Sequence, residues 1–138
     1  MMKKIAIISV VFSLMVTLFS CDQDTPVPYT KVKFTVNIYA NNLVHIGGYE
    51  YFTGGISGIV VYRADMNTFY AYDRACAYDW DYLGRVEMDT AGGLYLIDYH
   101  CGSTYNILNG YPIAGPAKQP LRSYNAQLVS DTYLQVSN

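Results

Sequence analysis

The fold is decided by two stretches of sequence, Tyr70-Ala-Tyr-Asp-Arg-Ala-Cys76-Ala-Tyr-Asp79 and Tyr99-His-Cys101-Gly-Ser-Thr-Tyr105. Each follows a run of aromatic and β-branched residues, which favour β-strands. They contain Cys76 and Cys101, the two cysteines that remain once the N-terminal leader is set aside. The sequence therefore predicts two loops at the ends of strands, with one cysteine in each loop.

The rest of the chain after the leader also indicates strands. Lys31–Tyr39 alternates strictly between polar and apolar residues, which is the pattern of a half-buried strand. Gly58–Arg63 and Thr68–Tyr72 predict a hairpin, and Tyr49–Thr53, between two glycine pairs, a loop or an edge segment. Further short strands are expected at Leu43–Ile46, Arg85–Asp89, Leu94–Ile97, Ser103–Leu108, Tyr111–Ile113, Leu121–Leu128 and Thr132–Val136. Because no window shows helical spacing, we expect one all-β domain of about ten short strands, a small sandwich or barrel.

The first 20 residues have the organisation of a signal peptide. Lys3 and Lys4 precede the apolar run Ile5–Phe19, which is short for a membrane span. The run leads into Ser20-Cys21, which resembles the lipobox of bacterial lipoproteins, where the cysteine is diacylated. The alternative is an uncleaved anchor with an incidental cysteine. We expect a lipoprotein signal peptide over residues 1–20, an acylated Cys21 with a tether over 21–30, and the β domain over 31–138.

The net charge and the N-terminal leader limit where the protein can be located and which partners it can bind. Residues 21–138 keep all 11 acidic residues but only 7 of the 9 basic ones, a side-chain charge of −4. No Lys/Arg cluster is present, which argues against nucleic acid as a partner. Lipid on Cys21 would tie the domain to a membrane without a spanning helix. Asp22 and Asp24 after it are similar to the start of Bacteroidetes surface lipoproteins, so we expect the bacterial outer membrane or cell surface.

Between Gly58 and Val136 the chain resembles a Rieske domain. That family has a first metal loop C-x-H, a second metal loop C-x-x-H-G-S-x-F/Y, and a G-P-A-x-x-P-L segment that covers the cluster. The corresponding residues are Cys76-Ala-Tyr78, then Gly102-Ser-Thr-Tyr105, then Gly115-Pro116-Ala117 with Pro120-Leu121. The resemblance implies a Rieske-like antiparallel β-sandwich or barrel with both loops at one end. There, the family holds a [2Fe–2S] cluster by one cysteine and one histidine from each loop.

The resemblance places the four ligand positions on Cys76, Tyr78, Asp98 and Cys101. Starting the second loop at Cys101 instead puts its histidine on Thr104, so neither alignment supplies a histidine. His100 is one position off, and neighbouring side chains on a strand or tight loop point in different directions. Two thiols, a phenol and a carboxylate are a poor set for a [2Fe–2S] cluster. The resemblance therefore implies a domain that has lost its cluster and has no cofactor.

Without a metal, Cys76 and Cys101 would lie on facing loop tips, and an oxidising envelope favours a disulfide between them. In the chain-entropy model this bond would contribute on the order of 3–4 kcal/mol. We thus expect a lipid-anchored envelope protein with a binding or structural role and no enzymatic activity. Two alternatives stay open: a Rieske-type electron-transfer protein that holds a [2Fe–2S] cluster with atypical ligands, and a thiol–disulfide redox protein using the same two cysteines.

Other groups of residues give weaker indications of a functional site. Asp79-Trp80-Asp81 could bind a hard cation, but it lacks calcium-loop spacing, and acids are common on solvated loops. Trp80 with Tyr78, Tyr82 and Tyr99 could form an exposed aromatic platform at the loop tips for a protein or glycan partner, or could simply cover the core. No nucleophile elbow or other catalytic motif stands out, so no catalytic residue is predicted.

Overall fold

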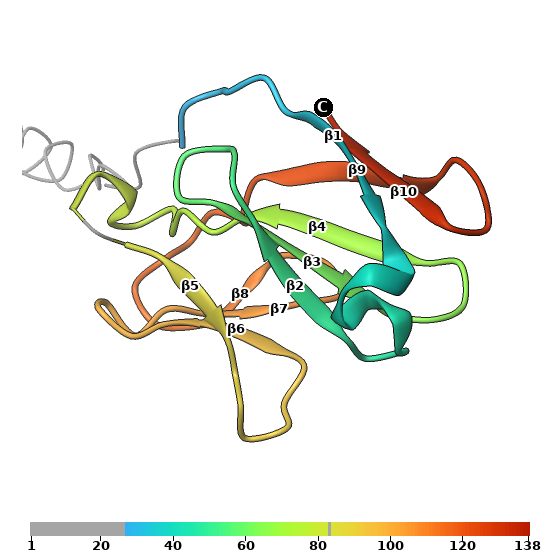
Figure 1. Ribbon diagram of the computed structural model, residues 1–138. Helices are drawn as coiled ribbons and strands as arrows, with labels where there is room; N and C mark the ends of the chain where they lie inside the picture. The colour runs from blue at the N-terminus through green and yellow to red at the C-terminus, as the bar shows by residue number, and fades with distance from the viewer. Residues whose placement is uncertain (1–26, 83) are drawn as a thin grey trace, which may run out of the picture.

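A computed structural model describes residues 27–82 and 84–138 (Figure 1). These residues form two antiparallel sheets, one of six strands in the order β1-β10-β9-β4-β3-β2 and one of four in the order β5-β6-β7-β8. The strands are β1 (Lys33–Asn37), β2 (Tyr49–Phe52), β3 (Ile59–Arg63), β4 (Phe69–Asp73), β5 (Val86–Met88), β6 (Tyr95–Asp98), β7 (Thr104–Asn106), β8 (Pro112–Ala114), β9 (Ser123–Leu128) and β10 (Tyr133–Ser137). The 3-10 helices are η1 (Ile38–Ala40), η2 (Asn42–Val44) and η3 (Trp80–Tyr82). The predicted all-β class with ten short strands is confirmed, and within the described residues no helix is long and apolar enough to cross a bilayer.

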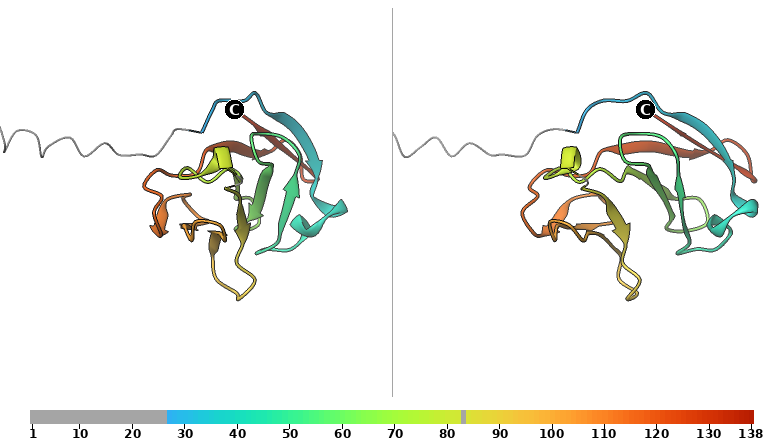
Figure 2. Two further views of the ribbon diagram at one scale, coloured as in Figure 1. Left: turned by 90° about the vertical axis from the view of Figure 1, so that its left-hand side faces the viewer. Right: turned by 60° about the vertical axis from the view of Figure 1, so that its left-hand side comes forward.

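Strand β3, which lies next to the edge strand β2, is buried on both faces and therefore contributes to two cores. Ile59 and Val61 belong to a core with β1, β9 and β10, whereas Val60 and Tyr62 belong to a second core shared with the small sheet. Successive side chains of a strand point to opposite faces, so the apolar run from Ile59 to Tyr62 fits a strand covered on both sides. Figure 2 shows the four-stranded sheet beside the larger one. The second core includes Cys76, so it extends to the first loop.

Most predicted strands are present, with shifted ends. β3 and β4 form the predicted hairpin, and β2 is an edge strand paired with β3, in the segment expected to be a loop or an edge. β1 pairs with β10, and its apolar face is buried as the alternation predicts. It ends at Asn37, earlier than expected, because the Asn37 side chain accepts a hydrogen bond from the Tyr39 amide (3.0 Å) and starts η1.

The strand predicted at Leu43–Ile46 is wrong. The Asn41 side chain accepts a hydrogen bond from the Leu43 amide (2.9 Å), which starts the 3-10 helix η2. Asparagine side chains compete with strand pairing in this way by satisfying nearby backbone donors. Leu43 is fully buried within the first core, so its apolar character reflects burial of a turn rather than of a strand.

The chain contacts the domain before the boundary expected at residue 31. Residues 27–30 have no regular secondary structure, but Val27 is buried and its carbonyl accepts a hydrogen bond from Arg122. The Thr30 carbonyl accepts one from the Asn138 side chain (2.6 Å). The predictions for residues 1–26, including the signal peptide and lipid on Cys21, lie outside the described residues.

Candidate functional site: a cysteine and aspartate group between two loops

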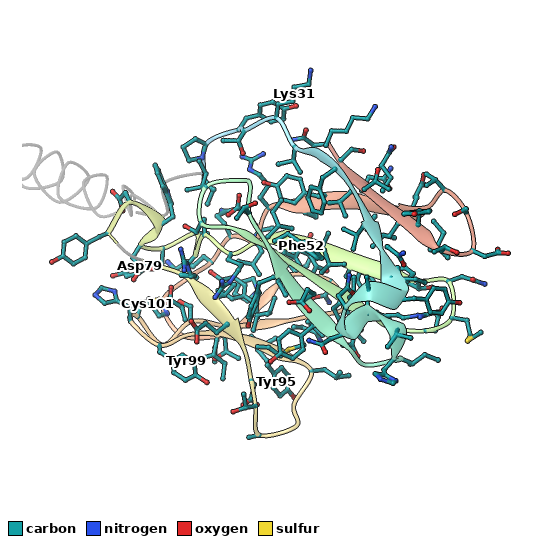
Figure 3. The ribbon with its side chains drawn as sticks, viewed as in Figure 1. Lys31, Phe52, Asp79, Tyr95, Tyr99 and Cys101 are labelled. Atoms are coloured by element: carbon teal, nitrogen blue, oxygen red, sulfur yellow. The ribbon has the colours of Figure 1, made fainter. Side chains whose placement is uncertain are left out.

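Two loops at one end of the molecule bring four ligand-type side chains together. The first loop follows β4 and supplies Cys76 and Asp79, and the second begins at Asp98, the last residue of β6, and also supplies Cys101. One ligand atom from each of these residues lies within 4.8 Å of the other three. The two Sγ atoms are 3.6 Å apart. Figure 3 shows Asp79 and Cys101 near one another at this end. We call these four residues the Cys–Asp group.

Asp73, the last residue of β4, fixes the start of the first loop. It is fully buried, and its carboxylate accepts hydrogen bonds from four donors. These are the amides of Ile56 (2.7 Å), Ser57 (3.1 Å) and Ala75 (3.0 Å) and the hydroxyl of Tyr124 (2.8 Å). The carboxylate therefore ties the loop before β3, strand β9 and the residue before Cys76 to one point.

The second loop is a tight turn around Asp98. Its Oδ1 atom accepts hydrogen bonds from the amides of His100 (2.7 Å) and Cys101 (3.3 Å). Its carbonyl accepts one from Gly102 (2.8 Å), whose φ of +80° suits glycine. These bonds hold Cys101 within the turn and leave Asp98 Oδ2 as the oxygen without a partner.

Two hydroxyls contact the sulfur atoms. The Tyr105 hydroxyl lies 3.3 Å from Cys76 Sγ, and the Ser103 hydroxyl lies 3.1 Å from Cys101 Sγ. Both residues are fully buried. Ser103 also accepts a hydrogen bond from the Ala117 amide (3.1 Å). The segment carrying Gly115, Pro116, Ala117 and Pro120 thus lies against the second loop.

His100 joins the two loops at the edge of the group. Its Nδ1 atom lies 2.7 Å from Asp79 Oδ2, and its side chain is about half exposed. Sequence reasoning placed His100 outside the ligand set, and the structure places it in contact with one member of the group, which itself contains no imidazole. His100 is therefore a neighbour that can orient Asp79.

Asp79 is the member of the group that the Rieske motif did not identify, although Asp79-Trp80-Asp81 was considered as a possible hard-cation site. The first-loop ligand position falls on Tyr78, whose side chain is 44% exposed, whereas Asp79 is 8% exposed. The carbonyl of Asp79 accepts hydrogen bonds from the amides of Tyr82 and Gly84 (both 2.9 Å), which close the turn containing η3. Gly84 packs so closely that a Cβ atom there would lie 2.1 Å from Asp79 Oδ1. The feature of the sequence that could have identified Asp79 is an acidic residue at the start of a short turn that ends in Gly84.

The Cys–Asp group brings two thiols and two carboxyl groups together in a largely buried environment. Burial raises the pKa of the Cys76 thiol, and burial together with the nearby Asp79 carboxylate raises the pKa of Asp98. Burial also opposes ionisation of Asp79, but the hydrogen bond with His100 and those with neighbouring groups hold its pKa below the usual value. Asp79 Oδ1 and Asp98 Oδ2 are buried without a hydrogen-bond partner. A bound cation would stabilise the negative charge of these buried carboxylates.

The donor set does not fit a Rieske [2Fe–2S] cluster. Such a cluster needs two thiolates on one iron and two imidazoles on the other, and the group offers two thiols and two carboxylates. A cluster also inserts a second iron and two sulfides between its ligand pairs, so ligands of different irons lie farther apart than ligands of one ion. All four ligand atoms here lie within 4.8 Å of one another. The disulfide predicted between Cys76 and Cys101 stays a prediction, since both are thiols in this structure.

The outer surface of the loops carries aromatic side chains. Tyr78, Tyr82 and Tyr99 are 44%, 69% and 65% exposed. Beside them is a groove of about 680 Å³, whose lining includes Trp80, Tyr99, His100 and Asp98. The three tyrosines are therefore exposed at the loop tips, and a partner that contacts them stays a prediction.

Comparison with known proteins supports the fold. No protein-family model matches the chain, and no curated protein does. A chain in the solved complex of reduced oxygenase and oxidized ferredoxin in carbazole 1,9a-dioxygenase is 18% identical with a TM-score of 0.53, and the match covers 78% of this chain and 94% of that one. The ferredoxin of carbazole 1,9a-dioxygenase from Nocardioides aromaticivorans IC177 is 21% identical with a TM-score of 0.49, over 78% of this chain and 97% of that one. The first likeness shows the fold, and the expected Rieske-like architecture is confirmed.

Proposed function

We propose that this protein is a lipid-anchored component of a bacterial cell envelope whose Rieske-like domain serves in binding and has lost the Rieske cluster. One observation carries the proposal: both loops and the hydroxyls that contact their sulfur atoms are present, but the four ligand-type residues that meet there are two cysteines and two aspartates, with no imidazole among them. The solved complex that contains the matching chain is one of an oxygenase with a ferredoxin. Electron transfer through a [2Fe–2S] cluster is therefore the alternative to be tested.

The test is iron and acid-labile sulfide analysis of the protein isolated without chelators under anaerobic conditions. We expect neither the two irons and two sulfides per chain nor the visible absorption of a cluster. The absorption of a Rieske cluster depends on its own iron and sulfide, so apoprotein and adventitious iron are distinguishable from it. Stoichiometric iron and sulfide would overturn the proposal and establish the electron-transfer alternative.

The proposed lipid anchor leads to a separate prediction about Cys21. Replacement of Cys21 by alanine should move the protein from the detergent phase to the aqueous phase in a phase-separation assay of whole cells. The reason is that an acyl chain contributes about 0.8 kcal/mol of membrane affinity for each buried CH₂ group. Metabolic labelling with a fatty acid should disappear in the same variant. Unchanged partitioning of Cys21→Ala would instead favour an uncleaved N-terminal anchor.

We expect a partner to contact the exposed tyrosines at the loop tips. A protein or glycan that stacks on aromatic faces fits such a platform. On a glycan array, the double variant Tyr82→Ser/Tyr99→Ser should lose the signals that the wild-type domain gives. The control is Tyr39→Ser, because Tyr39 is equally exposed (61%) but lies in η1, away from the two loops. Equal loss in both variants, or none in either, would remove the loop tips as the glycan surface and direct the search to a protein partner.

A further inference from the structure

We infer that Cys76, Asp79, Asp98 and Cys101 bind a single tetrahedrally coordinated divalent transition-metal ion of the zinc type. The inference rests on the proposed function, since it requires that no two-iron cluster occupies the same end of the domain. It adds a cofactor that the sequence did not predict. It also gives the buried carboxylates a role.

The spacing of the four ligand atoms is that of one ion. Zinc bonds of about 2.0–2.3 Å place the ligands of a tetrahedron about 3.3–3.8 Å apart. The two Sγ atoms of the group are already 3.6 Å apart, and all four ligand atoms lie within 4.8 Å of one another. Only a contraction of the wider pairs is needed to close the tetrahedron.

The donor chemistry selects the class of metal. Calcium and magnesium take oxygen ligands, so two thiols argue against them. Zinc accepts both cysteine sulfur and aspartate oxygen, and four protein ligands are typical of a structural zinc site rather than a catalytic one. On binding, the two thiols release their protons to solvent, because thiolates are the ligands.

The unpartnered oxygens are a second observation that points to a cation. Asp98 is 1% exposed and Asp79 is 8% exposed, and each has one buried carboxylate oxygen without a hydrogen-bond partner. Buried carboxylate oxygens are costly unless they are paired or coordinate a metal. A disulfide between Cys76 and Cys101 would satisfy the sulfur atoms but would supply neither a donor nor a positive charge to these oxygens.

The surroundings of the group are those that metal ligands require. Asp98 Oδ1 is held by two backbone amides, and Asp79 Oδ2 contacts His100 at 2.7 Å. The hydroxyls of Tyr105 and Ser103 lie within 3.3 Å and 3.1 Å of the two sulfur atoms and can donate to thiolates. Such outer contacts orient ligands and tune the metal, and their loss typically weakens binding 10–100-fold.

The experiment uses the full chain, reduced and freed of metal with a chelator. Added Zn²⁺ should bind at one equivalent and raise the melting temperature. Added Co²⁺ should give thiolate charge-transfer bands and the visible bands of a tetrahedral ion. Asp79→Asn and Asp98→Asn should each weaken Zn²⁺ binding at least roughly tenfold. The matched control is Asp81→Asn, because Asp81 belongs to the same turn but is exposed, and it should bind as the wild type does.

Three outcomes would overturn the inference. They are the absence of any Zn²⁺- or Co²⁺-dependent signal, equal affinity in the wild type and in both aspartate variants, and a Cys76–Cys101 disulfide in protein taken directly from the envelope. If a variant does not fold, which circular dichroism would show, the Co²⁺ spectrum of the wild type still decides between thiolate ligation and none. Two irons with two sulfides would overturn the proposed function itself. Protein with neither cluster nor zinc affinity would overturn this inference alone.

Discussion

Replacement of Asp73 by alanine is expected to lower the free energy of unfolding by about 3–5 kcal/mol, a large part of the 5–15 kcal/mol typical of a domain. The carboxylate accepts hydrogen bonds from three backbone amides and from the Tyr124 hydroxyl, and the residue is fully buried. Alanine would leave these donors buried without an acceptor, and each such group costs about 1–3 kcal/mol before any relaxation. Urea denaturation followed by circular dichroism measures the difference.

Two further variants separate the hydrogen bonds of Asp73 from a general effect of removing an acid. Asp73→Asn keeps one oxygen acceptor, so its loss should be smaller than that of the alanine variant. Asp131→Ala removes an exposed acid in the turn between β9 and β10, and it should stay within about 0.5 kcal/mol of the wild type. If Asp73→Ala were as stable as Asp131→Ala, the carboxylate would not be what holds the first loop.

The sequence predicted the strands well where a single pattern of apolar residues runs through a whole segment. β1 alternates because one face lies on a core, and β3 is apolar from Ile59 to Tyr62 because both faces do. Both segments could be read without knowing what they pack against. The strand predicted at Leu43–Ile46 failed because the side-chain oxygen of Asn41 accepts from a backbone amide and starts a 3-10 turn, and apolar content does not report such a bond.

Prediction of the site residues from the sequence was limited in the same way, because some side chains are positioned by contacts that the sequence does not report. Motif spacing led to Cys76, Asp98 and Cys101, because these positions are fixed by the strands that precede them and by the glycine after Cys101. Asp79 was missed because the closing of the turn at Gly84 directs it inward, and that closure depends on contacts between backbone atoms. Asp73 was missed because its four donors come from three separate segments of the chain.

The contacts around the two sulfur atoms would suit either a cluster or a single metal ion. The hydroxyls of Tyr105 and Ser103 contact sulfur, and a hydroxyl donates equally well to a thiolate of a cluster or of a single ion. Ser103 also binds the Ala117 amide, so the second loop and its cover are linked through the same side chain. The link between the second loop and its cover therefore runs through Ser103 and Ala117, and neither residue belongs to the Cys–Asp group.

Gly115→Ala tests that cover directly, and it should lower the free energy of unfolding by about 3–4 kcal/mol. At Gly115 the φ angle is +87°, and a Cβ atom would lie 2.5 Å from Ser103 Cα and 2.6 Å from the Gly102 carbonyl oxygen. A left-handed backbone costs an alanine about 1–2 kcal/mol. The remainder comes from backbone atoms that cannot move aside without displacing the second loop. Urea denaturation measures the stability, and the rate at which Cys101 is alkylated measures opening of the cover.

Gly92→Ala is the matched control, because Gly92 has nearly the same φ angle (+89°) but nothing within 4 Å of an added Cβ atom. It should lose only the backbone part, about 1–2 kcal/mol, and leave the alkylation of Cys101 unchanged. The difference between the two variants therefore isolates the contact between the cover segment and the second loop. Equal losses in the two variants would mean that backbone conformation alone accounts for Gly115, and that the cover does not hold Cys101 in place.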